Sequence, residues 1–205
     1  MAARSDVKAV TITADTVALD ADGISAAASV GNNAALTIGG ALASGGAVAL
    51  SHGRIVTILS AGNDAAKSFT VTGTDINGTA QTESITGANA GTATGTKFFK
   101  TISGISAVGN PAGNVSAGVN SSAADVIFSG RSRLKGIYLT STATAGTVDF
   151  LTTSSSGTSI MGLSSVGDAD ATRDVVIPDE GVVFSDGIYI EYTVSTFLTL
   201  TVFHA

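Results

Sequence analysis

The chain has 205 residues and a net charge of −6, and only 13% of its residues are charged, against roughly 25% in typical soluble domains. The absence of cysteine excludes disulfides, thiolate metal sites and a cysteine nucleophile. The few Lys and Arg are scattered along an acidic chain, which argues against a nucleic-acid groove. So low a charge favours a surface partly covered by other chains, and a Thr- and Ser-rich surface that is polar without being charged explains the composition equally well.

Residues 1–52 are rich in Ala and Gly. The first ten residues have no apolar stretch behind their positive charges, so we expect no secretory signal. No charge occurs between Asp22 and His52, but two adjacent Asn and many Gly argue against a membrane span. We interpret residues 1–52 as an extended N-terminal arm with the first strands, at 7–14 and 35–38, and small side chains would let this arm lie close against a neighbouring subunit.

Residues 53–129 show no helical periodicity. Short segments of β-branched and apolar residues are instead separated by Gly, Asn, Asp and Ser clusters at roughly ten-residue spacing, which is typical of an all-β sandwich or barrel. We expect a β-sandwich or barrel here, completed by strands from residues 1–52. Its predicted strands are 54–60, 68–73, 81–86, 97–102, 114–119 and 125–128.

The hairpin around Asn77-Gly78 allows a test of register. A two-residue turn would place Ile85 opposite Thr70, on the other face from Phe69 and Val71. A loop with an odd number of residues corrects this. The sequence therefore predicts a three- or five-residue connection, with Phe69, Val71 and Ile85 on one buried face.

Residues 130–205 form a second predicted unit, a small C-terminal β-domain that begins after a boundary near Ser129 and Gly130. A turn is expected at 178–181, where Pro and Gly flank two acidic residues. The last two strands have matching alternation, which predicts a hairpin closed by a three-residue loop at 195–197. The predicted strands are 134–140, 147–152, 159–163, 174–177, 182–184, 188–194 and 198–203.

The only cluster of basic residues is Arg131, Arg133 and Lys135. On a strand these alternate residues share one face, so they are a candidate contact for an acidic partner. A solvated strand face is the alternative interpretation.

No motif in the chain indicates catalysis. The two histidines, His52 and His204, lie far apart in the sequence, and no serine has the Gly-x-Ser-x-Gly pattern of a nucleophile elbow. The segment 91–97 has glycines like a phosphate-binding loop, but Thr96 separates the second Gly from Lys97. We therefore expect no enzyme, no cofactor and no metal site, although two acidic clusters are conceivable calcium ligands. These clusters are Asp20 with Asp22, and Asp168 with Asp170 and Asp174.

Two segments carry a family resemblance. The segment GRIVTILSAGNDAAKSFTVTGTDING and its continuation, residues 53–119, resembles an Ig-like β-sandwich unit of tailed-bacteriophage virion proteins. The segment from RLKGIYLTSTATAGTVDF to YTVSTFLTLTVFHA, residues 133–205, looks like a small β-domain of similar phage proteins. The resemblance implies a non-catalytic virion protein that is made in the bacterial cytoplasm.

Among virion components, the leading expectation is a capsid decoration or cement protein that bridges capsomers. Its partners would be copies of itself, with a trimer as the typical assembly, and the major capsid protein, with no nucleic acid and no membrane. A head–tail adaptor, tail or fibre-base component is the alternative within virions. A carbohydrate-binding or adhesin β-sandwich module is the alternative from another class.

Overall fold

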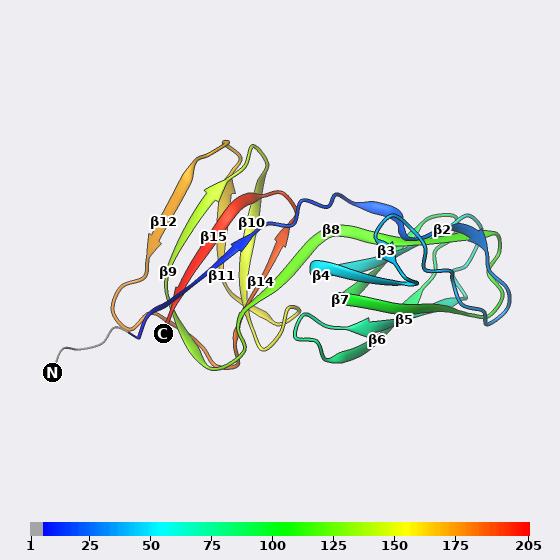
Figure 1. Cartoon of the computed structure of the whole chain (residues 1–205), viewed down its shortest axis with the longest axis horizontal. Helices are drawn as coiled ribbons and strands as arrows, with labels where there is room; N and C mark the ends of the chain where they lie inside the picture. The colour runs from blue at the N-terminus through cyan, green and yellow to red at the C-terminus, as the bar shows by residue number, and fades with distance from the viewer. Residues whose placement is uncertain (1–5) are drawn as a thin grey trace. The chain divides into compact units, whose positions relative to one another are not determined.

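The computed structural model describes residues 6–205, which form fifteen strands and no helix (Figure 1). The all-β class predicted from the sequence is confirmed, and both sheets are open, as in a sandwich. The chain divides into two compact units. We call Val17–Ala123 the inserted unit. Residues up to Thr16 join Ala124–Ala205 in the other, which we call the split unit.

Residues 1–52, expected as an arm with the first strands, contribute to both units. β1 (Lys8–Thr13) pairs with β15 (Phe197–His204) in the split unit. β2 (Asp20–Ser29) and β3 (Ala43–Ser44) belong to the inserted unit, where β2 pairs with β8 (Asn114–Phe128). The division between the units falls after Ala123, a few residues before the expected boundary at Ser129 and Gly130.

The split unit contains a five-stranded sheet of order β1-β15-β9-β12, in which β13 also pairs with β9. Its other layer consists of β11, β10, β14 and the end of β8. Buried side chains such as Leu134, Phe150 and Leu200 form its core. The rings of Tyr192 and Phe197, 4.8 Å apart between centroids, connect the two layers. The bounds are β9 (Ser132–Ser141), β10 (Ala145–Thr152), β11 (Thr158–Val166), β12 (Thr172–Val176), β13 (Val182–Phe184) and β14 (Ile188–Thr193).

The predicted C-terminal hairpin is wrong. β14 pairs with β10 in one sheet, whereas β15 pairs with β1 and β9 in the other. The connection between them therefore crosses from one layer to the next, and Ser195 takes a positive φ of 62° within it. Both strands bury alternate residues because they face each other across the core, so their alternation cannot distinguish such a crossing from a hairpin.

The inserted unit has the strand order β8-β4-β7-β5-β6, with β2 pairing β8 and β3 pairing β4. Its core contains Phe69, Phe99, Ile102 and Val119, which have no measurable exposure. Residues 30–42 lie against this core, and the Leu36 amide donates to the Ile105 carbonyl at 2.8 Å. The bounds are β4 (Ala47–Ser60), β5 (Ser68–Thr74), β6 (Ala80–Thr86) and β7 (Thr92–Val108).

The register predicted for the β5–β6 hairpin is confirmed. Phe69 lies opposite Ile85, and the last pair, Thr74 and Ala80, encloses a five-residue loop. Both Phe69 and Ile85 are buried. The loop is closed by the Asp75 carboxylate, which accepts hydrogen bonds from the Asn77 and Thr79 amides, while Gly78 supplies a φ of 81°.

A fully buried arginine fixes the inserted unit internally. Arg54 of β4 has no exposed surface. One terminal nitrogen of its guanidinium donates to the Val17 carbonyl at 2.8 Å, and the other donates to the Asn120 carbonyl of β8. A buried guanidinium has only donor groups and needs nearby acceptors. The two carbonyls supply them through charge-assisted hydrogen bonds, which link β4 to residue 17 and to β8.

Candidate interaction surface

The outer face of the five-stranded sheet carries a regular array of mostly uncharged side chains. The register places residues of β1, β15, β9 and β12 in three rows of four across the strands. We call these twelve positions the outer grid. The rows are Thr13, Thr199, Thr140 and Thr172; then Thr11, Thr201, Tyr138 and Asp174; then Ala9, Phe203, Gly136 and Val176.

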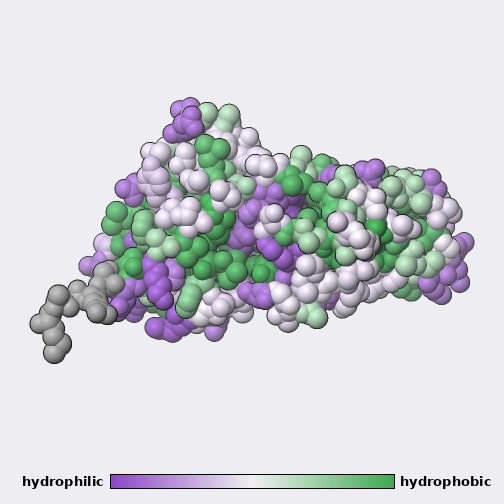
Figure 2. Space-filling view, in the orientation of Figure 1, coloured by the Kyte–Doolittle hydropathy of each residue, from purple (hydrophilic) through white to green (hydrophobic). Residues whose placement is uncertain are grey.

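The outer grid combines hydroxyl groups with exposed apolar surface. The Thr11 and Thr201 hydroxyls are 2.9 Å apart, and the Thr199 hydroxyl lies 3.4 Å from that of Thr140. Val176 is 78% exposed, Tyr138 41% and Phe203 37%. Figure 2 shows mostly white and green residues over these strands, with little purple among them. An exposed apolar patch with few charged residues is typical of a surface that contacts another protein.

Charge on the outer grid is confined to Asp174. In the sequence, β1, β15 and β9 supply only Thr, aromatic, Ala or Gly residues at these alternate positions, which is the alternation of a sheet with one buried face. The face opposite the core would be expected to carry Lys and Glu in a free monomer. Its low charge lowers the cost of removing water from this surface when a partner binds.

The basic cluster predicted from the sequence lies at one end of β9. Arg131, Arg133 and Lys135 are outward, while the intervening Ser132 and Leu134 are buried, as the predicted alternation requires. Two of the three head groups bind the chain itself. Arg133 donates to the Glu180 carbonyl at 3.3 Å and Lys135 to the Asp179 carbonyl at 3.0 Å.

These two bonds hold the turn that the sequence placed at 178–181. The Gly181 amide donates to the Pro178 carbonyl at 3.2 Å. Asp179 and Gly181 both have positive φ angles, 54° and 77°. Of the basic cluster, Arg131 is the most exposed member, and its contact with an acidic partner stays a prediction.

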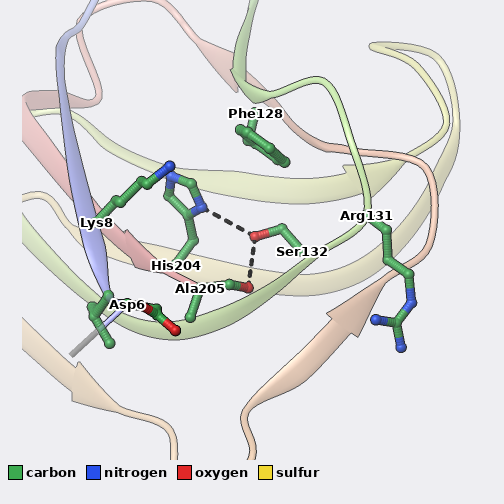
Figure 3. Close-up of a pocket in the computed structure, with 8 residues that line it drawn as sticks. Asp6, Lys8, Phe128, Arg131, Ser132, His204 and Ala205 are labelled. Atoms are coloured by element: carbon green, nitrogen blue, oxygen red, sulfur yellow. Dashed lines mark hydrogen bonds between the residues drawn. The ribbon is translucent and has the colours of Figure 1, made fainter. Parts of the chain in front are cut away.

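A pocket of about 380 Å³ opens at the end of the split unit where β1 begins and β15 ends (Figure 3). His204 and Ser132 lie at its base, with the His204 Nδ1 3.0 Å from the Ser132 hydroxyl. The Phe128 ring lies 5.1 Å from the His204 ring between centroids. Its lining comprises Asp6, Val7, Lys8, Phe128, Arg131, Ser132, His204 and Ala205.

The Ser132 hydroxyl has two polar neighbours. It donates to the Ala205 carbonyl at 3.1 Å and also lies within hydrogen-bond distance of the His204 Nδ1. Both side chains are buried, Ser132 at 3% and His204 at 4% exposure. Burial and the positive charge of Lys8 lower the pKa of His204, which favours the neutral ring. The pair connects β9 to β15 as part of the packing of this end of the sheet.

The glycine-containing segment 91–97 is already occupied by an anion of the chain itself. The Glu83 carboxylate accepts hydrogen bonds from the Thr96 amide at 2.6 Å and from the Lys97 amide at 3.4 Å. A Cβ at Gly95 would lie 2.6 Å from a Glu83 oxygen, so a larger residue there would require the Glu83 carboxylate to shift. These amides bind an internal carboxylate of β6, which leaves them without capacity for a phosphate.

The acidic clusters lie in separate places. Asp20 belongs to β2 and its carboxylate accepts from the Asp22 amide at 3.2 Å, a turn-like contact within the segment. Asp170 follows β11, whereas Asp174 lies on the outer grid. Within residues 6–205, no three His, Asp or Glu side chains are grouped so that they could hold a metal ion.

No helix long and apolar enough to cross a membrane occurs in the part of the chain that the structure describes.

Comparison of the chain with protein-family models, with curated proteins and with solved structures gives no match. The resemblance to phage virion proteins therefore depends on the two sequence segments quoted above. The outer grid was not foreseen from the sequence. Its only signal was the Thr at alternate positions near both ends of the chain, at Thr11, Thr13, Thr199 and Thr201.

Proposed function

We propose that this chain is a non-catalytic structural protein of a bacteriophage virion, and that it decorates the capsid by bridging capsomers. The observation that carries the proposal is the outer grid, a surface of twelve positions with one charged residue. The resemblance of residues 53–119 and 133–205 to virion β-domains supports the same assignment. The internal use of Ser132, His204 and Glu83 in packing also favours a structural role over a catalytic one.

The outer grid would bind the major capsid protein through two kinds of contact. Val176 and Phe203 would lose water when a subunit covers them. Full burial of an exposed apolar side chain contributes about 1.5–3 kcal/mol before the costs of association, so Val176, which is 78% exposed, would contribute a larger share of this range than Phe203, which is 37% exposed. The threonine hydroxyls can donate to or accept from backbone groups of the shell. A protein that binds only the assembled shell stabilises that shell by linkage, and this stabilisation is the function we propose.

The basic cluster would orient the chain on the shell. Arg131 is exposed at the end of β9, beyond the outer grid, and can meet a carboxylate of the capsid surface. Such a contact at the edge of an interface contributes more to orientation and to the association rate than to affinity.

The test is a cryo-EM reconstruction of particles that carry the chain, compared with particles carrying the variant Tyr138→Lys. We expect density for the chain on the head, with β1, β15, β9 and β12 against the shell, and loss of that density in the variant. Leu59→Lys is the matched control, because Leu59 is 36% exposed but lies in the inserted unit. This control should bind as the unchanged chain does.

Other outcomes would overturn the proposal in identifiable ways. Density at the neck or the tail would favour an adaptor, tail or fibre-base component. Specific binding of the isolated protein to a glycan array, without binding to shells, would favour the carbohydrate-binding alternative. Particles that contain none of the chain would exclude a virion component altogether.

A further inference from the structure

The pocket at the end of the split unit combines apolar walls with a lysine ammonium group. All of its lining residues belong to that unit. Phe128 and Val7, which are 37% and 43% exposed, supply apolar surface, and Lys8 of β1 supplies a positive charge. The volume of about 380 Å³ lies in the range of roughly 300–1,000 Å³ that is usual for small-molecule sites. A pocket of this composition fits a ligand that has an apolar body and a negatively charged end.

The ammonium group of Lys8 is not used by the chain itself. Among residues 6–205 it has no hydrogen-bond acceptor and no carboxylate partner. Most other basic side chains in this range donate instead to a backbone carbonyl. These are Arg54, Lys97, Lys100, Arg133 and Lys135. An unpaired positive charge in the wall of an apolar pocket attracts an anion.

His204 contributes a second polar group beside Lys8. The residue is 4% exposed, and its Nδ1 lies 3.0 Å from the Ser132 hydroxyl. Its other ring nitrogen, Nε2, has no hydrogen-bond partner among the described residues. Figure 3 shows the imidazole between the Ser132 hydroxyl and the Lys8 ammonium, whose charge acts on the ring. A largely buried ring with one nitrogen unpartnered indicates a place for a bound group.

We propose that this pocket binds a carboxylate joined to a small apolar group. The carboxylate lies between the Lys8 ammonium and the His204 Nε2, and the apolar group lies against the Phe128 ring. Hydrogen bonds between an ammonium and a carboxylate are stronger than those between neutral groups. Asp6 is the one acidic side chain of the lining, and Figure 3 shows it on the side of His204 away from the Lys8 ammonium. The corner beside Lys8 therefore stays positive.

Binding of the carboxylate is coupled to protonation of His204. In the free pocket, burial and the charge of Lys8 lower the pKa of His204. A bound carboxylate opposes the effect of Lys8 and raises this pKa, so the complex takes up a proton. The affinity should rise as pH falls through the pKa of His204 in the complex, and level off below that of the free pocket. Arg131, the remaining charged side chain of the lining, is directed away from the ring in Figure 3.

The test is an NMR titration of the full chain with sodium phenylacetate, which joins a carboxylate to one aromatic ring. The chain has two histidines, so the imidazole signals of His204 and His52 can be followed separately. We expect the His204 signals to move with a dissociation constant on the order of 1 mM. The signals of His52, which lies in the inserted unit, should stay in place.

Two variants and a neutral ligand separate the role of Lys8 from a general effect of charge. Lys8→Gln should weaken binding by about tenfold or more, because the charge-assisted bond to the carboxylate is lost. Lys8 is exposed, so the fold has room for glutamine. Lys67→Gln, an equal charge change in the inserted unit, should bind as the unchanged chain does. Phenylacetamide, the neutral analogue, should bind more weakly than phenylacetate by about tenfold or more.

Several results would overturn the proposal. These are equal binding of phenylacetate and phenylacetamide, full affinity in Lys8→Gln, His204 signals that stay in place, or an affinity that does not rise as pH falls from about 8 to about 5. None of these results concerns the outer grid, and binding of the chain to shells is measured separately. A failure of this proposal is therefore distinguishable from a failure of the proposed function.

A free organic acid and an acidic side chain of the shell protein present the same chemistry to this pocket. Binding of the chain to shells in excess phenylacetate distinguishes the two sources, and this one arm rests on the proposed function. Displacement from the shells assigns the pocket to a residue of the shell protein. Binding that phenylacetate leaves unchanged assigns it to a free acid.

Discussion

Replacing Arg54 with methionine removes a buried positive charge from the inserted unit but keeps most of the side-chain volume. The change removes the hydrogen bonds to the carbonyls of Val17 and Asn120. A bond from a charged donor contributes about 1.5–3 kcal/mol, and the loss is partly offset because methionine has no charge to desolvate. We expect the free energy of unfolding to fall by about 2–4 kcal/mol, and to fall further in Arg54→Ala, which also leaves a cavity.

Urea denaturation followed by far-UV circular dichroism measures this change. Tyrosine fluorescence does not report on Arg54, because the chain has no tryptophan and its three tyrosines, at 138, 189 and 192, lie in the split unit. Arg173→Met is the matched control, since Arg173 is exposed on β12 and its loss should change stability by less than about 0.5 kcal/mol. Equal free energies of unfolding for Arg54→Met and the unchanged chain would refute the conclusion that Arg54 stabilises the inserted unit.

Two further predictions concern carboxylates. Burial and the charge of Asp149, which lies directly opposite on β10, raise the pKa of Glu191. The folded state therefore binds this proton more readily than the unfolded state, so Glu191 lowers stability above its folded pKa and the penalty disappears as pH falls through that value toward 4.5. Glu191→Gln should raise the denaturation midpoint at pH 7 and lose this advantage near pH 4; an advantage independent of pH would contradict the reasoning. Glu83→Ala leaves the amides of Thr96 and Lys97 without their acceptor and should cost about 1–3 kcal/mol in the same urea assay, whereas Glu83→Gln, which keeps an acceptor oxygen, should cost less.

Local pairing was predictable from the sequence, and pairing between distant segments was not. The five-residue β5–β6 loop followed from parity, because Phe69 and Ile85 are close in sequence and must share one buried face. The C-terminal hairpin failed on the same argument, since alternation is identical in two strands that face each other across a core. β2 was not predicted as a strand, because its Ala and Ser residues have weak strand propensity.

The candidate surface was beyond sequence reasoning for a related reason. Arg133 and Lys135 lie on β9 and Arg131 directly precedes it, so the outward direction of these neighbouring residues could be predicted from local alternation. The outer grid instead requires the register of Thr11 with Thr201, residues 190 positions apart. No local pattern specifies such a pairing, and it depends on the closure of the whole split unit.

The pairing of β1 with β15 also orders events during synthesis. Residues 17–123 are complete when the ribosome has made little more than half of the chain, so the inserted unit can fold early. β1 must wait for β15, the last of the described strands to leave the ribosome. The rows of the outer grid therefore form only after β15 has been synthesised, so this surface cannot contact another chain before that point.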